Sequence, residues 1–314
     1  MSANPDPEMQ TVLNALEEEQ VPELNTLSIA DARALLTEMF SFSDEEMDSV
    51  AAVENGTVPG RNGEIPVRTY IPHGEGPFPL FVYYHGGGWI LGNLDTHDAT
   101  CRALANATES VVASVEYGLA PESPFPGPVE DCYDATEYLA TRADDFDSDA
   151  DRLIVGGDSA GGNLAAAVAL RARDIDGPSI SHQVLVYPVT DHAFDTDSYA
   201  ENASGYFITR ADMEWFWDLY LPSDLDGGNP YASPLRARSL EELPSASVIT
   251  AGFDPLRDEG VAYAERLAAA GVDVEHHSYD GSIHGFLSML VEPAVPHARD
   301  AIDKINADLE RTFE

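Results

Sequence analysis

Short apolar runs alternate with amphipathic stretches from about residue 65 to the end of the chain. Buried strands are predicted at the short runs 80–84, 153–155, 246–251 and 272–277. Helices are predicted where apolar residues recur at helical spacing, around Cys101, around Val129 and along 295–309. Alternating short strands and helices predict an α/β protein with a mostly parallel sheet covered by helices on both faces.

Two segments interrupt this alternation. Residues 1–55 are helical in character, with a capping signal at Ser28, and the turn-rich stretch 56–63 closes them. Residues 190–235 carry a second capping signal at Thr209. An insertion between strands lies above the ends of the sheet, where such folds bind ligands. We therefore predict that 1–55 and 190–235 form two parts of one cap, on a catalytic domain spanning 56–314.

Aromatic side chains are concentrated in the second of these segments and after the first predicted strand. We predict that they line a substrate pocket between cap and sheet. An alternative is that they only pack the cap onto the body of the protein. The residues concerned are Trp89, Tyr206, Phe207, Trp215 and Phe216.

A G-x-S-x-G pattern at 157–161 connects the predicted strand 153–155 to a predicted helix at 162–170. The glycines let the chain turn sharply, so Ser159 is presented at the helix start with a free hydroxyl. Such a pattern also fits an ordinary glycine-rich turn. Asp158 could be mistaken for a nucleophile, but Ser159 holds the central position.

Three successive glycines follow His85 at the end of another predicted strand. Their bare amides suit an oxyanion hole, in which Gly87, Gly88 and Ala160 would donate N–H groups. Gly86 would set the bend of the loop, and His85 would brace it rather than act as a base.

Two further candidates follow predicted strands downstream, Asp254 and His284. Ser159 would then be the nucleophile, His284 the general base and acid, and Asp254 the group that orients the imidazole. Asp258, four residues after Asp254, is the alternative acid.

The order Ser, Asp, His and these motifs resemble the hormone-sensitive-lipase-like carboxylesterases, a branch of the α/β-hydrolases. The matching stretches are 85–89, 156–163, 254–260, 284–286 and the Pro-rich 115–126, where Gly118 stands in place of the family's usual Arg. The resemblance implies an eight-stranded α/β-hydrolase fold, a helical cap and no cofactor. It also implies a serine carboxylesterase that hydrolyses short- to medium-chain esters through an acyl-enzyme intermediate.

Other functions remain compatible with the same residues. Amide, thioester or lactone hydrolysis and acyl transfer would use the same triad. A non-catalytic small-molecule binding protein on this scaffold is the further alternative, although such relatives lose the catalytic His that is present here at His284.

The charge balance is extreme, with 16 basic and 56 acidic residues, a net charge of −40 and Lys304 as the single lysine. This charge opposes binding to nucleic acid or anionic membranes. Repulsion of this size is screened in concentrated salt, where the Debye length falls to about 3 Å at 1 M. The sequence therefore predicts a protein of an extreme halophile.

The remaining sequence features point to a protein without metal or membrane segments. The adjacent His276 and His277 would face opposite sides of a strand, and the acidic stretch 145–151 lacks the glycine of a calcium loop. No signal segment or long apolar run is visible, so we predict a cytoplasmic protein. The last predicted strand, 272–279, is a candidate edge for a homodimer.

Overall fold

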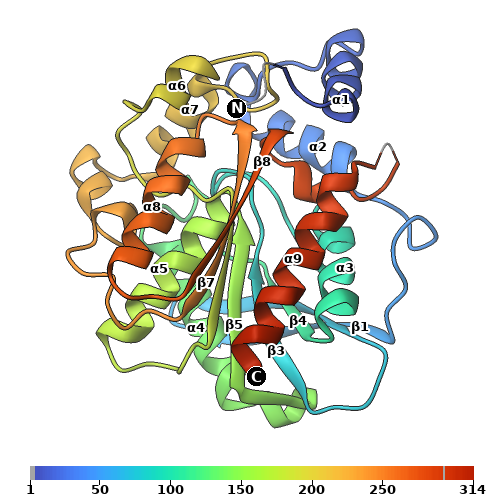
Figure 1. The fold of residues 1–314 in the computed structure, drawn as a ribbon, viewed down its shortest axis with the longest axis vertical. Helices are drawn as coiled ribbons and strands as arrows, with labels where there is room; N and C mark the ends of the chain where they lie inside the picture. Colours follow the sequence, from blue (N-terminus) through green and yellow to red (C-terminus); the bar gives the residue numbers. More distant parts are fainter. Residues whose placement is uncertain (1–3, 293) are drawn as a thin grey trace.

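The structure is a computed structural model that describes residues 4–292 and 294–314. Within these residues eight strands form one sheet in the order β1-β2-β4-β3-β5-β6-β7-β8 (Figure 1). β1 pairs antiparallel with β2 and β2 with β4, and all other neighbours are parallel. The strands are β1 Ala52–Gly60, β2 Gly63–Ile71, β3 Phe78–Tyr84, β4 Val111–Val115, β5 Ser148–Asp158, β6 His182–Val186, β7 Ser245–Phe253 and β8 Val274–Ile283. The predicted mostly parallel α/β fold is confirmed.

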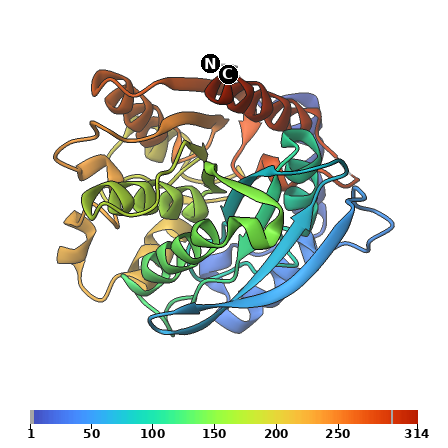
Figure 2. The same cartoon turned by 90° about the horizontal axis from the view of Figure 1, so that it is seen from below.

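Helices cover both faces of this sheet. α4, α5 and α8 pack on one face, and α3 and α9 pack on the other (Figures 1 and 2). The helices are α1 Pro7–Glu18, α2 Ile29–Phe40, α3 Asp98–Thr108, α4 Gly127–Thr141, α5 Ala160–Asp174, α6 Asp197–Glu201, α7 Arg210–Tyr220, α8 Arg257–Ala269 and α9 Pro296–Phe313.

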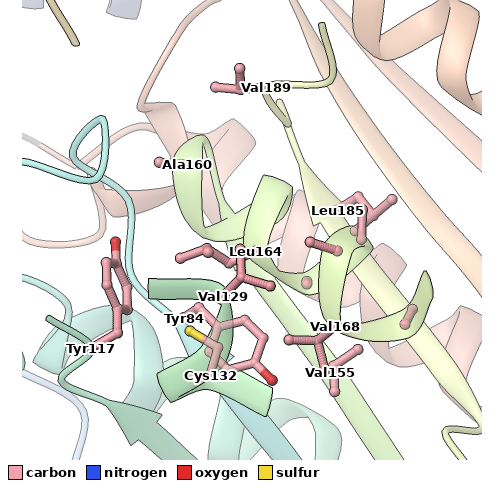
Figure 3. Packing of buried hydrophobic residues seen from close by; sticks show 14 of the residues in the cluster. Tyr84, Tyr117, Val129, Cys132, Val155, Ala160, Leu164, Val168, Leu185 and Val189 are labelled. Carbon is pink, nitrogen blue, oxygen red and sulfur yellow. The ribbon is translucent and has the colours of Figure 1, made fainter. Parts of the chain in front are cut away.

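The core therefore has two layers of buried side chains, one on each side of the sheet. Every residue of β3 is buried, and its alternate side chains enter opposite layers, Val82 on the α5 side and Phe81 on the α9 side. Leu164 and Val168 of α5 belong to the first layer (Figure 3). Because both faces are covered, the central strands read as continuous apolar runs.

The N-terminal edge of the sheet differs from the prediction. Residues 52–55 were expected to continue a helical segment and 56–63 to form turns, but Ala52–Gly60 is strand β1. It pairs with β2 from Ala52 opposite Ile71 to Gly60 opposite Gly63. The prediction was wrong because an exposed edge strand needs no apolar run: only Val58 is buried, and hydrogen bonds to β2 define the strand.

Four helices, α1, α2, α6 and α7, lie beyond the C-terminal ends of the parallel strands (Figure 1). The two segments that supply them touch, since the backbone N–H and side-chain amide of Asn25 both donate to Asp212 of α7, at 2.9 and 3.0 Å. Arg33 ties α2 to the body by donating to the carbonyls of Ile90 and Ala120. The capping signals predicted at Ser28 and Thr209 are confirmed at the starts of α2 and α7.

Candidate active site

Ser159 occupies the sharp turn between β5 and α5. Its backbone has φ 56° and ψ −119°, a conformation that non-glycine residues adopt at an energetic cost. A side chain on either Gly157 or Gly161 would collide with the carbonyl oxygen of Tyr84 at the end of β3. The two glycines thus allow the turn to lie directly against the neighbouring strand, and the Ser159 N–H donates to Val186.

His284 lies between Ser159 and Asp254 in one line of hydrogen bonds. Its Nε2 is 2.9 Å from Ser159 Oγ, and its Nδ1 is 2.8 Å from Asp254 Oδ2. Asp254 directly follows β7, is completely buried, and accepts a second hydrogen bond from the N–H of Leu256. A carboxylate that holds the Nδ1 proton leaves Nε2 free to accept the proton of the serine hydroxyl.

The alternative acid, Asp258, lies elsewhere in the first turn of α8. Its carboxylate forms an ion pair with Arg257 at 2.7 Å and accepts the N–H of Ser198 at 2.8 Å. Of the two candidate carboxylates, it is therefore Asp254 that contacts the imidazole of His284.

The glycine loop after β3 lies beside Ser159. Gly87 and Gly88 have φ values of 113° and 60°, which favour glycine. A side chain on Gly88 would also overlap the ring of Phe216. Within the described part of the chain, no group accepts a hydrogen bond from the Gly87 or Gly88 amide, so both donors are available to a ligand.

Asp158 connects this loop to the serine turn, a role that the sequence did not reveal. Its Oδ1 accepts hydrogen bonds from the Gly86 N–H at 3.0 Å and the Tyr83 hydroxyl at 2.7 Å, and lies 3.2 Å from His97 Nε2. Burial disfavours the charged carboxylate, but the nearby imidazole and these hydrogen bonds outweigh it. The pKa of Asp158 is therefore held below its ordinary value.

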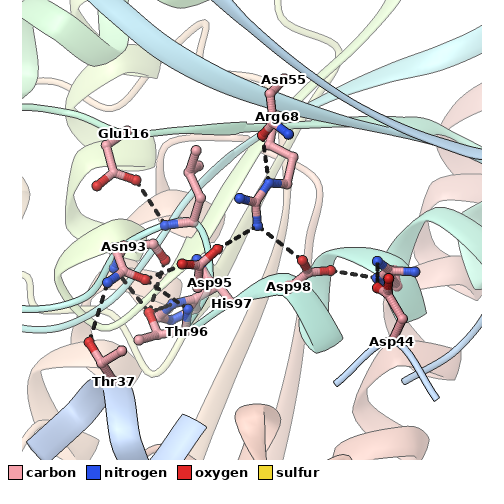
Figure 4. A network of polar contacts seen from close by, with 12 residues as sticks. Thr37, Asp44, Asn55, Arg68, Asn93, Asp95, Thr96, His97, Asp98 and Glu116 are labelled. Atoms are coloured by element: carbon pink, nitrogen blue, oxygen red, sulfur yellow. Dashed lines mark hydrogen bonds and ion pairs between the residues drawn. The ribbon is translucent and has the colours of Figure 1, made fainter. Parts of the chain in front are cut away.

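The turn that carries His97 is itself fixed by polar contacts (Figure 4). The Asn93 side chain accepts the N–H of Thr96 at 2.9 Å, and the Thr96 hydroxyl is 2.9 Å from His97 Nδ1. Asp98, next along the chain, forms an ion pair with Arg68 of β2 at 3.0 Å. A histidine at the helix start soon after the glycine motif was the available sequence signal for this support.

His85 is buried beneath the glycine loop. Its ring stacks on Tyr117 with centroids 4.3 Å apart, and its Nδ1 lies 2.8 Å from the carbonyl oxygen of Gly86. Burial, reinforced by His97, lowers the pKa of His85 to about 3. A neutral, stacked imidazole of this kind fits the bracing role predicted for His85.

A cavity of about 70 Å³, called the inner cavity below, opens onto Ser159, His284 and the glycine loop. Of the five predicted pocket residues, Phe207 and Phe216 line it, Tyr206 lines an adjoining larger cavity, and Trp89 and Trp215 line neither. Trp89 is instead completely buried, stacked on Tyr220 at 4.1 Å. The remaining wall comes partly from residues that the sequence did not single out, Leu24, Leu36 and Phe40.

Among the described residues, no group of three or more His, Cys, Asp or Glu side chains is arranged to hold a metal ion. None of the helices in the described ranges has the length and apolarity needed to cross a membrane.

Comparison with known proteins decides the family. The sequence model for the alpha/beta hydrolase fold matches residues 81–288, a stretch that contains the glycine loop and all three members of the hydrogen-bonded line. The chain belongs to this family.

Curated α/β-hydrolase relatives include two ester hydrolases of Mycobacterium tuberculosis. Carboxylic ester hydrolase LipN is 47% identical over 74% of this chain and 64% of its own length. Carboxylesterase NlhH is 40% identical over 83% of each chain. Among solved structures, an α/β-hydrolase from the metagenome of Lake Arreo, Spain, superposes with a TM-score of 0.93 and 41% identity, covering 99% of both chains.

Proposed function

We propose that this protein is a serine carboxylesterase that hydrolyses short- to medium-chain carboxylic esters through an acyl-enzyme intermediate. The hydrogen-bonded line from Ser159 through His284 to Asp254 is the observation that carries this proposal. The names of LipN and NlhH support carboxylic esters as the substrate class.

Acylation begins when Ser159 Oγ attacks the ester carbonyl carbon and His284 Nε2 takes the hydroxyl proton. Asp254 stabilises the imidazolium that forms. The carbonyl oxygen becomes an oxyanion, which accepts hydrogen bonds from the amides of Gly87, Gly88 and Ala160. His284 then gives its proton to the alkoxy oxygen, the carbon–oxygen bond breaks, and the alcohol leaves.

Deacylation repeats these steps with water as the nucleophile. His284 removes a proton from the water, the resulting hydroxide attacks the acyl carbon, and the same three amides bind the oxyanion. The proton returns from His284 to Ser159 Oγ as the carboxylic acid is released. With the ester and one water molecule as the only reactants, both half-reactions balance, and His284 carries the proton in each of them.

Residues 1–55 and 190–235 act, we infer, as one cap that shapes the substrate cavity. The contact of Asn25 with Asp212 supports this grouping, as does the contribution of both segments to the inner cavity. Because β1 begins at Ala52 and pairs with β2, we propose a boundary of the first part close to Ala52 rather than after residue 55.

The net charge of −40 supports a further proposal, adaptation to concentrated salt in an extreme halophile. Folding concentrates like charges, and the stability of a domain is only about 5–15 kcal/mol, so unscreened repulsion can decide whether it folds. We expect activity and circular dichroism to be lost on dilution from 3 M to about 0.05 M KCl. An unchanged spectrum and rate would refute salt adaptation and leave the esterase proposal intact.

A homodimer and a cytoplasmic location are two further proposals. β8 forms one edge of the sheet, so we propose that the predicted segment 272–279, most of which belongs to β8, pairs with a second copy. Light scattering of the purified protein, with Ser278→Pro as the disrupting variant, tests that dimer. A cytoplasmic location stays a prediction that fractionation of the source cells would test.

A serine-directed fluorophosphonate gives the most direct test of the esterase. We expect a single adduct on the peptide that carries Ser159, lost in both Ser159→Ala and His284→Ala. Rates with matched p-nitrophenyl ester, anilide and thioester substrates then separate ester hydrolysis from the related reactions. A faster anilide or thioester reaction would contradict the substrate class while keeping the triad.

A further inference from the structure

A second and larger cavity adjoins the inner cavity. This outer cavity, of about 500 Å³, lies between α1, residues 21–24, α2 and residues 205–209. Leu24, Leu36 and Phe207 line both cavities. Small-molecule sites commonly measure about 300–1,000 Å³, so the outer cavity has the size of such a site and the inner cavity is far smaller.

Phe207 stands at the boundary between the two cavities. Its φ of 71° is rare for a bulky residue, and a strained backbone of this kind often marks a functional position. The ring packs edge-on against Phe40 of α2, with centroids 6.3 Å apart. It also lies above Gly285, where an added side-chain carbon would come within 3.2 Å of the ring.

The position of Phe207 beside His284 indicates on which side of Ser159 the alcohol part of the ester would lie. His284 must deliver its proton to the leaving alkoxy oxygen, so the alcohol part of the substrate lies on the His284 side of Ser159. Gly285 follows His284 directly and is covered by Phe207. The alcohol part therefore leads past Phe207, toward the outer cavity.

If the alcohol part points toward the outer cavity, the inner cavity is left for the acyl part. The inner cavity has walls that the outer cavity does not share, formed by side chains such as Leu91, His97 and Phe216. Phe216 packs so closely on Gly88 that it leaves no space for a side chain there. A short acyl group fits this side better than a long one.

The lining of the outer cavity adds a chemical preference. Apolar side chains such as Leu13, Leu16 and Met39 share the lining with the carboxylates Glu17 and Glu23. No Lys, Arg or His occurs among the described residues that line it. An apolar alcohol group, neutral or cationic, is compatible with this surface, whereas an anionic group would be repelled.

We propose that the preferred substrates are esters of a short acyl group with a larger apolar alcohol, which occupies the outer cavity while Phe207 separates the two parts. This assignment rests on the esterase function proposed above. The assignment predicts that, of two isomeric esters, the one with the longer alcohol has the higher kcat/KM.

Hexyl acetate and ethyl hexanoate are such a pair, because they are isomers that differ only in which side of the ester is long. We expect kcat/KM for hexyl acetate to be higher by about tenfold or more, the scale of a few methylene groups in a hydrophobic pocket. Equal values, or a preference for ethyl hexanoate, would overturn the assignment. Absence of hydrolysis with both isomers and with ethyl acetate would overturn the esterase function together with it.

Two variants on α1 test the location. Asn14 is exposed and lines the outer cavity, whereas the neighbouring Ala15, also exposed, does not. Asn14→Trp should lower kcat/KM for hexyl acetate about tenfold more than for ethyl acetate, and the control Ala15→Trp should not change this ratio. An unchanged ratio in Asn14→Trp would overturn the assignment.

A third variant tests the boundary itself. Phe207→Ala joins the two cavities, so a long acyl chain gains access to the outer one. The ratio of kcat/KM between hexyl acetate and ethyl hexanoate should fall toward one. A ratio that stays at the wild-type value would show that Phe207 does not separate the two parts, and so would contradict the assignment.

Discussion

The oxyanion side and the acid side of the proposed active site each contain a buried carboxylate. On the oxyanion side, Asp158 holds the Gly86 amide. On the acid side, Glu259 in the first turn of α8 accepts the N–H groups of Thr190 at 2.6 Å and Asp191 at 3.2 Å. Both side chains are at least nine-tenths buried.

The protein gives these two carboxylates opposite properties. Burial acts on both, but His97 and the hydrogen bonds around Asp158 keep the pKa of Asp158 low. Burial raises the pKa of Glu259 to about 8, because two amide hydrogen bonds do not compensate for it and the carboxylates of Asp191 and Asp254 oppose a further charge. The partners of a buried carboxyl, rather than its depth, thus decide whether it is charged at neutral pH.

We expect the largest effect from substitution of Ser159, the proposed nucleophile. Ser159→Ala removes the nucleophile, and single removals from a triad lower the rate by about 10⁴ to 10⁶. Esterase rates with p-nitrophenyl butyrate measure the loss, and circular dichroism checks that the fold remains. Activity above a few per cent of wild type would contradict the assignment of Ser159.

Removal of the acid is the next largest change. Asp254→Asn leaves the shape intact but no longer holds the Nδ1 proton on His284, and kcat should fall by about 10⁴. Asp258→Asn is the matched control on the same side, and its kcat should fall much less. If Asp258→Asn were the more damaging change, the acid role would belong to Asp258.

On the oxyanion side, Asp158→Asn should have an intermediate effect. The carboxylate positions the glycine loop without touching the substrate, so we expect kcat to fall by about 10 to 100 with little change in KM, less than the loss of an oxyanion donor itself. Affinity for a trifluoromethyl ketone, which mimics the tetrahedral intermediate, should fall in parallel. An unchanged kcat and inhibitor affinity would show that Asp158 has no part in positioning the loop.

The smallest effect concerns stability and distinguishes the two carboxylates by their response to pH. Folded Glu259 keeps its proton up to about pH 8, whereas the unfolded chain loses it near 4.5. Between these values the native state binds more protons, so a rise in pH favours unfolding and the loss ends above pH 8. Glu259→Gln removes this dependence.

Chemical denaturation in high salt measures this difference. From pH 5 to 8, the variant should gain stability relative to wild type by up to a few kcal/mol. Asp158→Asn should show no such gain over the same interval, because the pKa of Asp158 is already low. A difference between Glu259→Gln and wild type that does not change with pH would contradict the assignment of a raised pKa.

The sequence predicted the fold class and the ester-hydrolase class, which the family match and the relatives confirm. The reason is local: strand β5, the glycine-flanked turn and α5 are contiguous, so 153–170 carries both the motif and its setting. β1 was missed because its residues face solvent and depend on pairing with β2.

Features built from several segments were not predictable in the same way. Leu24, Leu36 and Phe40 line the inner cavity, but neither the helical spacing of Leu36 and Phe40 nor the turn that carries Leu24 gives a sign of it in the sequence. The pairing of Asp158 with His97 joins residues far apart in the chain, so the sequence gives no sign that the two side chains meet. Of the predicted aromatic pocket residues, Trp89 is instead buried in the core, where its ring stacks on that of Tyr220.

The closeness of the serine turn to β3 also limits how this protein can evolve. Gly157 and Gly161 tolerate no side chain beside the Tyr84 carbonyl, and Asp158 is engaged by three partners. Around the nucleophile, only position 160 is left to vary, and its side chain faces the packed core. Descendants of this enzyme can therefore acquire new specificities through the cap segments far more readily than through the turn that carries the reactive hydroxyl.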